Sequence, residues 1–143
     1  MPLALIFAAV AEERDGIASE PPIDVEARAA SWRLEGTLVA VADRGELVGS
    51  IHLDPSRHGF ADLGMAVARD WRGRGVGSAL LEAAVDWARA RGLHKLSLSV
   101  FPHNDAAIAL YRKHGFVEEG RRVKQFRRSN GELWDAVDMG LLL

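Results

Sequence analysis

The chain has 143 residues, 48% of them apolar and 27% charged, and this balance predicts one compact domain over residues 1–143. The absence of cysteine excludes a disulfide framework, a thiolate metal site and an acyl-cysteine intermediate, so any group transfer is direct or uses another nucleophile. The net charge of −2 is unevenly divided: residues 1–70 carry 12 acidic and 6 basic side chains, and residues 71–143 carry 8 and 12.

The first ten residues are apolar, and Ala9–Ala11 resembles a small-residue cleavage pattern. The basic segment of a secretory signal is missing, however, and the apolar stretch is too short for a membrane span. We therefore expect a cytoplasmic protein with no membrane partner. Two helices are predicted next, over residues 3–15 and 25–34; Asp24 suits the N-cap of the second, and Gly36 suits its end.

Three β-rich segments follow, at residues 37–43, 46–53 and 61–68. The first two flank Arg44-Gly45, a two-residue hairpin signature, so they are expected to pair antiparallel. In the third, Gly64 indicates either a bulge or a glycine needed for packing.

The second half of the chain predicts a crossover and a closing hairpin. Its elements are a helix over residues 77–91, a strand over 95–100, a helix over 105–114, and strands over 121–128 and 133–143 around a turn at 129–132. Asn104 suits the N-cap of the second of these helices, and Gly92 and Gly115 suit helix ends. The order predicts an α/β fold with a mixed sheet.

The segment RGRGVG, residues 72–77, lies between a predicted strand and a predicted helix. Unpaired amides and the helix dipole favour an anion there, and Arg72 and Arg74 add guanidinium groups. A nucleotide P-loop is excluded because no glycine-lysine pair follows at the required spacing, and a dinucleotide fingerprint would need a glycine where Ser78 stands. A simple tight turn would need only one glycine.

This segment resembles the R/Q-x-x-G-x-G/A signature of the GNAT N-acetyltransferase superfamily, and NDAAIALYRKHGF, residues 104–116, is similar to that family's second cofactor motif. The likeness runs from about Ala8 to the C-terminus and is nearest to small-molecule, antibiotic or phosphinothricin-type acetyltransferases. It implies a mixed, mostly antiparallel sheet flanked by helices. The family usually begins with a strand before the first helix, and residues 1–2 leave no room for one, so the chain is either truncated or lacks that strand.

The resemblance implies acetyl-CoA as co-substrate and no metal. The residues implied to hold the pyrophosphate are Arg72, Gly73, Arg74, Gly75, Val76, Gly77 and Ser78. Those implied to hold the pantetheine arm or the thioester are Met65, Ala66, Val67 and Asn104, with an amide near Val67 facing the oxyanion. Tyr111 would hold or protonate the CoA thiolate. Tyr111 and Asn104 could instead be a packing residue and a simple N-cap.

The general base is less defined, because the acceptor amine must lose a proton but no motif marks the group that takes it. Glu20 and Asp62 are the first candidates, followed by His52 and His103. Each of the four could instead be an ordinary solvated or capping residue.

The favoured function is an acetyl-CoA-dependent N-acetyltransferase acting on an amine of a small molecule or peptide by direct attack. The basic second half suits polyanionic CoA, and the acidic first half suits a cationic amine. A non-catalytic CoA or acyl-CoA sensor is an alternative, which the presence of Tyr111 disfavours. A nucleic-acid binder using residues 121–128 is disfavoured by a pI near 6.2, so no nucleic-acid partner is expected. A homodimer through the closing hairpin or an exposed sheet edge stays open.

Overall fold

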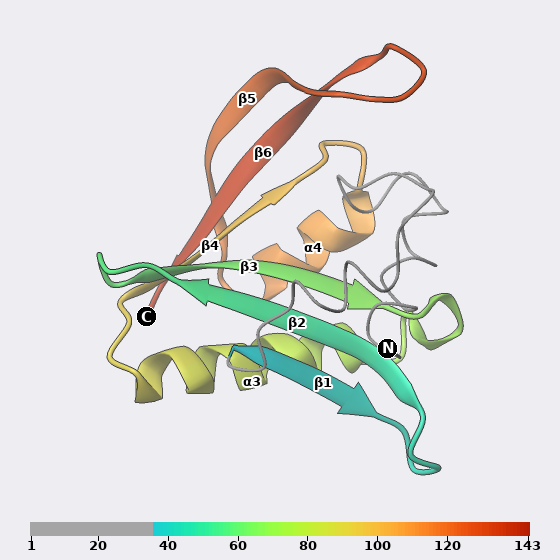
Figure 1. Ribbon diagram of the computed structural model, residues 1–143, viewed down its shortest axis with the longest axis vertical. Helices are drawn as coiled ribbons and strands as arrows, with labels where there is room; N and C mark the ends of the chain where they lie inside the picture. The colour runs from blue at the N-terminus through green and yellow to red at the C-terminus, as the bar shows by residue number, and fades with distance from the viewer. Residues whose placement is uncertain (1–35) are drawn as a thin grey trace.

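The computed structural model of this protein describes residues 36–143 (Figure 1). Its elements are β1 (Thr37–Val41), β2 (Leu47–Pro55), β3 (Phe60–Val67), the short 3-10 helix η1 (Arg69–Trp71), α3 (Val76–Ala90), β4 (Lys95–Val100), α4 (Asp105–Lys113), β5 (Val117–Arg127) and β6 (Leu133–Leu142). The helices predicted over residues 3–15 and 25–34, and the question of a first strand before them, lie outside the described residues.

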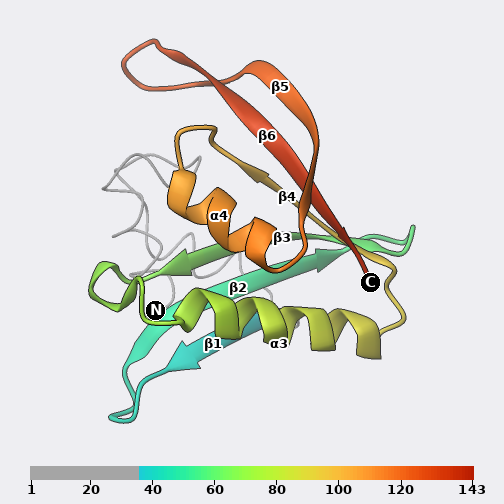
Figure 2. The ribbon, with the colours of Figure 1, turned by 180° about the vertical axis from the view of Figure 1, so that it is seen from behind.

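The six strands form one sheet in the order β1-β2-β3-β4-β6-β5. Every neighbouring pair is antiparallel except β3 and β4, which are parallel and joined by the α3 crossover. The predicted α/β fold with a mixed, mostly antiparallel sheet is confirmed. Seen from behind, α3 and α4 lie on the same face of this sheet (Figure 2).

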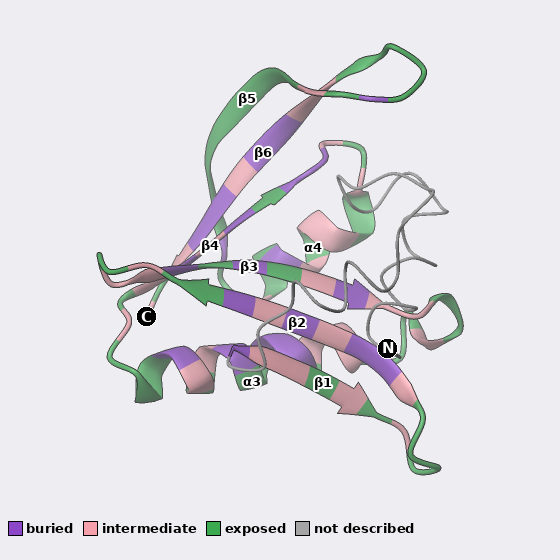
Figure 3. Ribbon diagram, in the orientation of Figure 1, coloured by how far each residue is buried: buried purple, intermediate pink, exposed green. Residues whose placement is uncertain are grey.

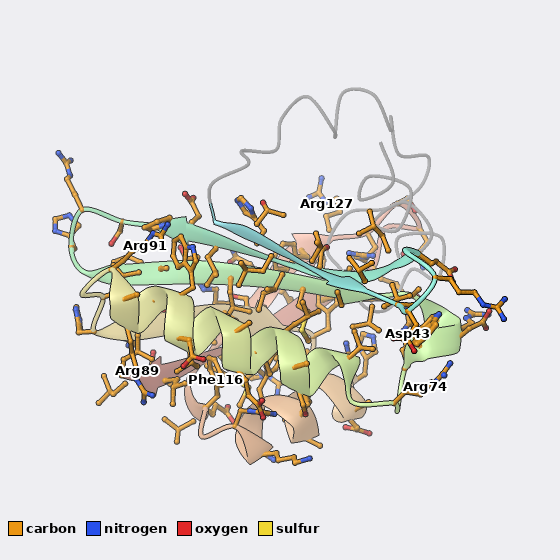
Figure 4. All side chains as sticks on the ribbon, turned by 90° about the horizontal axis from the view of Figure 1, so that it is seen from below. Asp43, Arg74, Arg89, Arg91, Phe116 and Arg127 are labelled. Atoms are coloured by element: carbon orange, nitrogen blue, oxygen red, sulfur yellow. The ribbon has the colours of Figure 1, made fainter. Side chains whose placement is uncertain are left out.

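Helix α3 packs on the sheet through the apolar stripe that its sequence predicts. Leu80, Leu81, Ala84 and Ala88 are buried, and they share one core cluster with strand residues such as Ile51. Viewed along the sheet, α3 lies beneath the strands, with Arg74 in the loop before its first turn and Arg89 near its last (Figure 4). The stripe repeats at the helical period, and burial of this apolar area stabilises the crossover.

The β1–β2 and β5–β6 hairpins each turn through three residues, where the sequence predicted two for β1–β2. In the first, the Ala42 N–H donates to Glu46 O and the Gly45 N–H donates to Ala42 O, with Gly45 at φ 81°. The loop is therefore Asp43–Gly45, a type I turn closed by a left-handed glycine. The predicted two-residue turn at Arg44-Gly45 is wrong because Gly45 occupies the third loop position. The second hairpin repeats this geometry at Gly131, φ 89°.

Strands β3 and β4 are paired only at their first residues. The ladder runs from Phe60–Lys95 to Asp62–Ser97 and then stops, and the strands diverge beyond it (Figure 1). We call the space between residues 63–67 and 98–100 the β3–β4 gap. The bulge predicted at Gly64 is wrong, because β3 keeps a continuous register with β2 through this residue. Among residues 36–143, no atom lies within 4 Å of where a Gly64 Cβ would stand, so packing within this part of the chain does not require a glycine there.

Strand β5 is exposed along almost its whole length (Figure 3) and begins at Val117, earlier than predicted. It is bulged: between the pairs Arg122–Ala136 and Phe126–Trp134, β5 uses three residues where β6 uses one. Within the bulge Lys124 adopts φ 52°, and its N–H donates to Asp135 Oδ1 at 2.7 Å. The bulge redirects the residues after it, as bulges beside functional sites do.

Candidate active site

The β3–β4 gap exposes backbone groups inside the sheet. The Ala68 N–H donates to Val48 O on β2, and because bonding direction alternates along a strand, the even-numbered residues of β3 face β2. The N–H and C=O groups of Met65 and Val67 therefore point into the gap, whereas those of Ala66 belong to the β2–β3 ladder. Three strand residues were predicted to pair with a pantetheine arm. Two of them, Met65 and Val67, have backbone groups that face the gap, and Ala66 does not.

The loop at residues 72–78, which we call the glycine loop, leads from the gap into α3. Gly73 and Gly75 have φ of 72° and 87°, and Gly75 is the N-cap of α3. This left-handed backbone favours glycine, and no described atom lies within 4 Å of where either Cβ would stand. The start of this 15-residue helix, next to the two glycines, has the geometry at which backbone amides and the helix dipole favour an anion, as the sequence analysis expected of this segment.

Gly77 serves a different purpose from the two glycines before it. A Cβ at this position would stand 2.8 Å from Leu110 Cδ2 on α4 and 3.5 Å from Met65 Cε on β3. The third glycine of the motif thus allows α4 to approach the first turn of α3.

Both arginines of the loop contact residues that precede the loop in the chain. Arg72 Nε donates to Val67 O at 3.1 Å, which ties the loop to the end of β3. The Arg74 guanidinium stacks over the Trp71 ring at 4.0 Å from its centroid. Their positive charges lie beside the cradle, where they favour a polyanion.

A hydrogen bond that the sequence did not reveal links the glycine loop to α4. His114 at the C-terminal end of α4 and Ser78 in the first turn of α3 lie 2.9 Å apart, Nε2 to Oγ. They are 36 residues apart in the chain, so no local sequence pattern predicts this contact. Together with the close approach at Gly77, this bond holds α4 against the cradle.

Helix α4 carries the two other residues that the motif singled out. The Asn104 Oδ1 accepts the Ala107 N–H at 3.3 Å, which confirms the predicted N-cap. Tyr111 is buried in the core cluster that also contains Leu63 and Leu98, the residues at the base of the gap. Burial raises the pKa of Tyr111 to about 12, so its hydroxyl stays protonated at neutral pH and can donate.

The sheet face opposite α3 and α4 carries polar side chains beside the gap. Asp62, Leu63, Leu98, Ser99, Arg122, Gln125 and Phe126 line a pocket of about 360 Å³ there. Asp138 joins two of these residues, since its Oδ1 accepts from Ser99 Oγ at 2.6 Å and its Oδ2 from Arg122 Nε at 2.8 Å. Although burial raises the pKa of Asp138, these two bonds lower it overall. We call the set Asp62, Ser99, Arg122 and Asp138 the polar face.

Asp62 is the candidate base that the structure brings to the gap. It is the last β3 residue paired with β4, and within residues 36–143 its carboxylate has no hydrogen bond. Burial raises the pKa of Asp62, Asp54 and Asp138 raise it further, and Arg122 lowers it. A raised pKa makes a carboxylate a stronger base.

The other base candidates are less suited or lie elsewhere. Glu20 lies outside the described residues, as do the acidic residues of the first helices. His52 Nδ1 lies 2.8 Å from Thr37 Oγ1, so the ring is engaged on the β1–β2 pair. His103 stacks on Phe101, with ring centroids 5.8 Å apart, and meets Trp134 edge-on at 4.8 Å.

The basic segment at residues 121–128 is largely engaged within the protein. Arg121 bonds Asp135, Arg122 bonds Asp138, and Arg128 is buried with its guanidinium 4.3 Å from the Trp134 ring centroid. Three of the five basic side chains in this segment are thus engaged within the protein, so they do not form one continuous free surface for a nucleic-acid backbone.

Two features are absent from residues 36–143. No group of three or more His, Asp or Glu side chains between Gly36 and Leu143 is arranged to hold a metal ion. None of the helices found there is long and apolar enough to cross a bilayer.

A mixed sheet that splits between two parallel strands, next to a glycine loop that opens a crossover helix, defines an acyltransferase-like fold and site. The model described as "Acetyltransferase (GNAT) family" matches residues 7–116, and the chain belongs to this family. The resemblance stated from the motifs is confirmed.

The chain is similar in sequence or in structure to several named proteins. The chain is 38% identical over 110 residues to the L-amino acid N-acetyltransferase AaaT of Escherichia coli, a match that covers 71% of this chain and 65% of the relative. It is 32% identical over 135 residues to an L-methionine sulfoximine/L-methionine sulfone acetyltransferase of Pseudomonas paraeruginosa, covering 87% of this chain and 78% of the relative. A ribosomal-protein-alanine N-acetyltransferase from Brucella melitensis superposes with a TM-score of 0.87 at 30% identity, over 99% of this chain and 92% of that one.

Proposed function

We propose that this protein transfers the acetyl group of acetyl-CoA directly to the amine of a small molecule. The observation that carries the proposal is the continuity of the β3–β4 gap with the glycine loop. An extended chain that pairs with Met65 and Val67 in the gap leads to the amides at Gly73 and Gly75, which suit a pyrophosphate. The chain also lies in a family whose named members acetylate amines.

The residues that flank the gap fit the steps of direct transfer. Asp62 takes a proton from the acceptor ammonium, and the amine nitrogen then forms a bond to the thioester carbon. An amide near Val67 donates to the oxyanion as the tetrahedral intermediate forms. When the C–S bond breaks, Tyr111 gives its proton to the thiolate and regains one from solvent. The nitrogen loses its second proton to solvent, and Asp62 releases to solvent the proton that it took, so both side chains return to their starting states. One proton is released per turnover.

Asp62 and Tyr111 approach the gap from opposite faces of the sheet. Ala61 and Leu63 point into the core on the helix side, so Asp62 between them points to the other face, whereas Tyr111 belongs to the helix-side core. The proposed base and acid are thus separated by the gap in which the thioester would lie. The residues 36–143 of a single copy supply the glycine loop, the gap and the polar face. The cysteine-free chain suits a reducing compartment, and we assign the reaction to the cytoplasm.

A thiol-release assay with acetyl-CoA and a panel of amines, amino acids and peptides tests the proposal, and a chain without cysteine adds no thiol background. We expect acetyl-CoA at 100 times its Kd to stabilise the protein by about 2.7 kcal/mol, seen as a higher Tm. We also expect at least one acceptor to cause release of CoA. Absence of both effects would refute the proposal. Binding without release for any acceptor would instead indicate a CoA or acyl-CoA sensor.

A further inference from the structure

Arg122 presents the free end of its guanidinium to the pocket beside the gap. It lines that pocket together with Asp62 and Ser99, and its side chain is 57% exposed. Its one hydrogen bond within residues 36–143 is made by Nε, to Asp138 at 2.8 Å. The two Nη groups therefore keep their hydrogens for another acceptor, and two parallel N–H donors match the two oxygens of a carboxylate.

The position of Arg122 is held by more than the single bond to Asp138. The Asp138 carboxylate is itself anchored from β4 by Ser99 Oγ at 2.6 Å, so β4, β5 and β6 all contribute to one network. The β5 bulge, stabilised by Asp135, then returns Gln125 and Phe126 to the same pocket. A guanidinium held in this way loses little freedom when it binds an anion.

The pocket places opposite charges at its two sides. Asp62 carries no hydrogen bond within the described chain, and it lies close enough to Arg122 for the two charges to interact. Next to Asp62 on the same face, Gly64 leaves the strand bare. The volume of about 360 Å³ suits an acceptor of amino-acid size.

We propose that Arg122 binds a carboxylate of the acceptor while Asp62 faces its amine, so that the acceptor is a free amino acid. This inference rests on the proposed function. A polyamine would bring a second positive charge toward Arg122 and be repelled, and a peptide would have no carboxylate beside its terminal amine. The guanidinium is thus a specificity determinant, because it favours one arrangement of charges over another.

The test compares each amino acid with the amine that remains when its carboxylate is removed, namely L-leucine with 3-methylbutylamine and L-methionine sulfone with 3-(methylsulfonyl)propylamine. For the wild-type protein we expect kcat/KM to favour the amino acid over its decarboxylated amine, in the pair with the higher activity, by roughly 10- to 150-fold, the range for hydrogen bonds to a charged group. Arg122→Gln is expected to reduce this ratio to about 1 by raising the KM of the amino acid, with the KM of acetyl-CoA unchanged. Arg122→Lys keeps the positive charge but loses the two parallel N–H donors of the guanidinium. It should therefore retain part of the preference for the amino acid over the amine.

Arg121→Gln is the matched control, because Arg121 is the neighbouring β5 residue, has a similarly exposed side chain at 51%, and also bonds an aspartate. It should leave the ratio unchanged. Loss of Arg122 also removes its lowering effect on the pKa of Asp62. This change acts on both acceptors of a pair, so it cancels in the ratio of their kcat/KM values. If Arg122→Gln fails to fold, Arg122→Lys and the wild-type ratios still decide the matter.

Equal kcat/KM for the two members of each pair in the wild type would overturn the inference while leaving the proposed function intact, because CoA would still be released. An equal loss for both members in Arg122→Gln would overturn it as well. Failure of every acceptor to release CoA would instead refute the proposed function itself.

Discussion

Gly75 in the glycine loop can be substituted to test whether the loop binds acetyl-CoA, because the effect on stability and the effect on KM can be measured separately. Gly75→Ala forces an L side chain into φ 87°, where no described atom crowds the new methyl group. The left-handed conformation costs roughly 1–2 kcal/mol, which lowers the Tm by roughly 2–8 °C for a chain of this size. The methyl group would also project into the open space of the cradle.

The second effect of Gly75→Ala falls on the co-substrate. Losing one hydrogen bond between an amide and a charged phosphate costs about 1.5–3 kcal/mol, so we expect the KM for acetyl-CoA to rise roughly 10- to 150-fold. Thiol release at varied acetyl-CoA measures this, with a saturating acceptor.

Gly131→Ala is the matched control, since Gly131 has φ 89° and equally open surroundings but lies in the β5–β6 hairpin loop. It should lower the Tm by a similar amount and leave the KM for acetyl-CoA unchanged. If both variants lose only stability and keep the wild-type KM, the glycine loop is not the pyrophosphate site and our reasoning about it fails.

Four further outcomes are expected. Tyr111→Phe should lower kcat about 100-fold or more while sparing the Tm and acetyl-CoA binding, because no hydrogen bond to the hydroxyl is present among the described residues; an unchanged kcat would exclude Tyr111 as the acid. Asp62→Asn should remove the acid limb of the kcat/KM profile, which in the wild type is displaced upward from that of an ordinary aspartate because burial raises the pKa of Asp62; persistence of that limb would point to another base. Asn104→Ala should cost about 1 kcal/mol of stability, measured by urea unfolding, and Asn104→Ser should restore it by keeping an N-cap acceptor. The hydrogen bond from the Lys124 N–H, and then that from Arg121, lower the pKa of Asp135. This carboxylate therefore stabilises the fold above its unfolded-state pKa, and the contribution is lost as pH falls through its folded-state pKa. In Asp135→Asn the urea midpoint should accordingly vary less between pH 5 and 2 than in the wild type.

Local signals predicted the elements that have local causes. The α3 stripe, the Asn104 cap and strand β4 at residues 95–100 were all readable because each depends on neighbours within one or two turns or on simple alternation. The bulge considered at Gly64 was wrong, because β3 keeps its register with β2 through this residue while its pairing with β4 ends at Asp62.

The features that sequence reasoning missed join distant segments. Ser78 meets His114 across 36 positions, Ser99 meets Asp138 across 39, and Arg122 meets Asp138 across 16. Gly77 looked like part of the phosphate motif, but the residue that requires it, Leu110, lies on another helix. None of these pairs has a spacing that a helix or strand period would mark, so only the fold brings them together.

The separation of β3 from β4 gives the protein a strand edge in the middle of its sheet. Unpaired edges on the outside of a protein invite other chains to add strands and aggregate. This inner edge is flanked by β2 on one side and by β4 and β6 on the other, and the gap closes where Asp62 pairs with Ser97. The unpaired backbone of this inner edge is reached from the open end of the gap and not along an outer edge of the sheet. The protein can therefore keep its backbone ready to bind without offering a template to its neighbours.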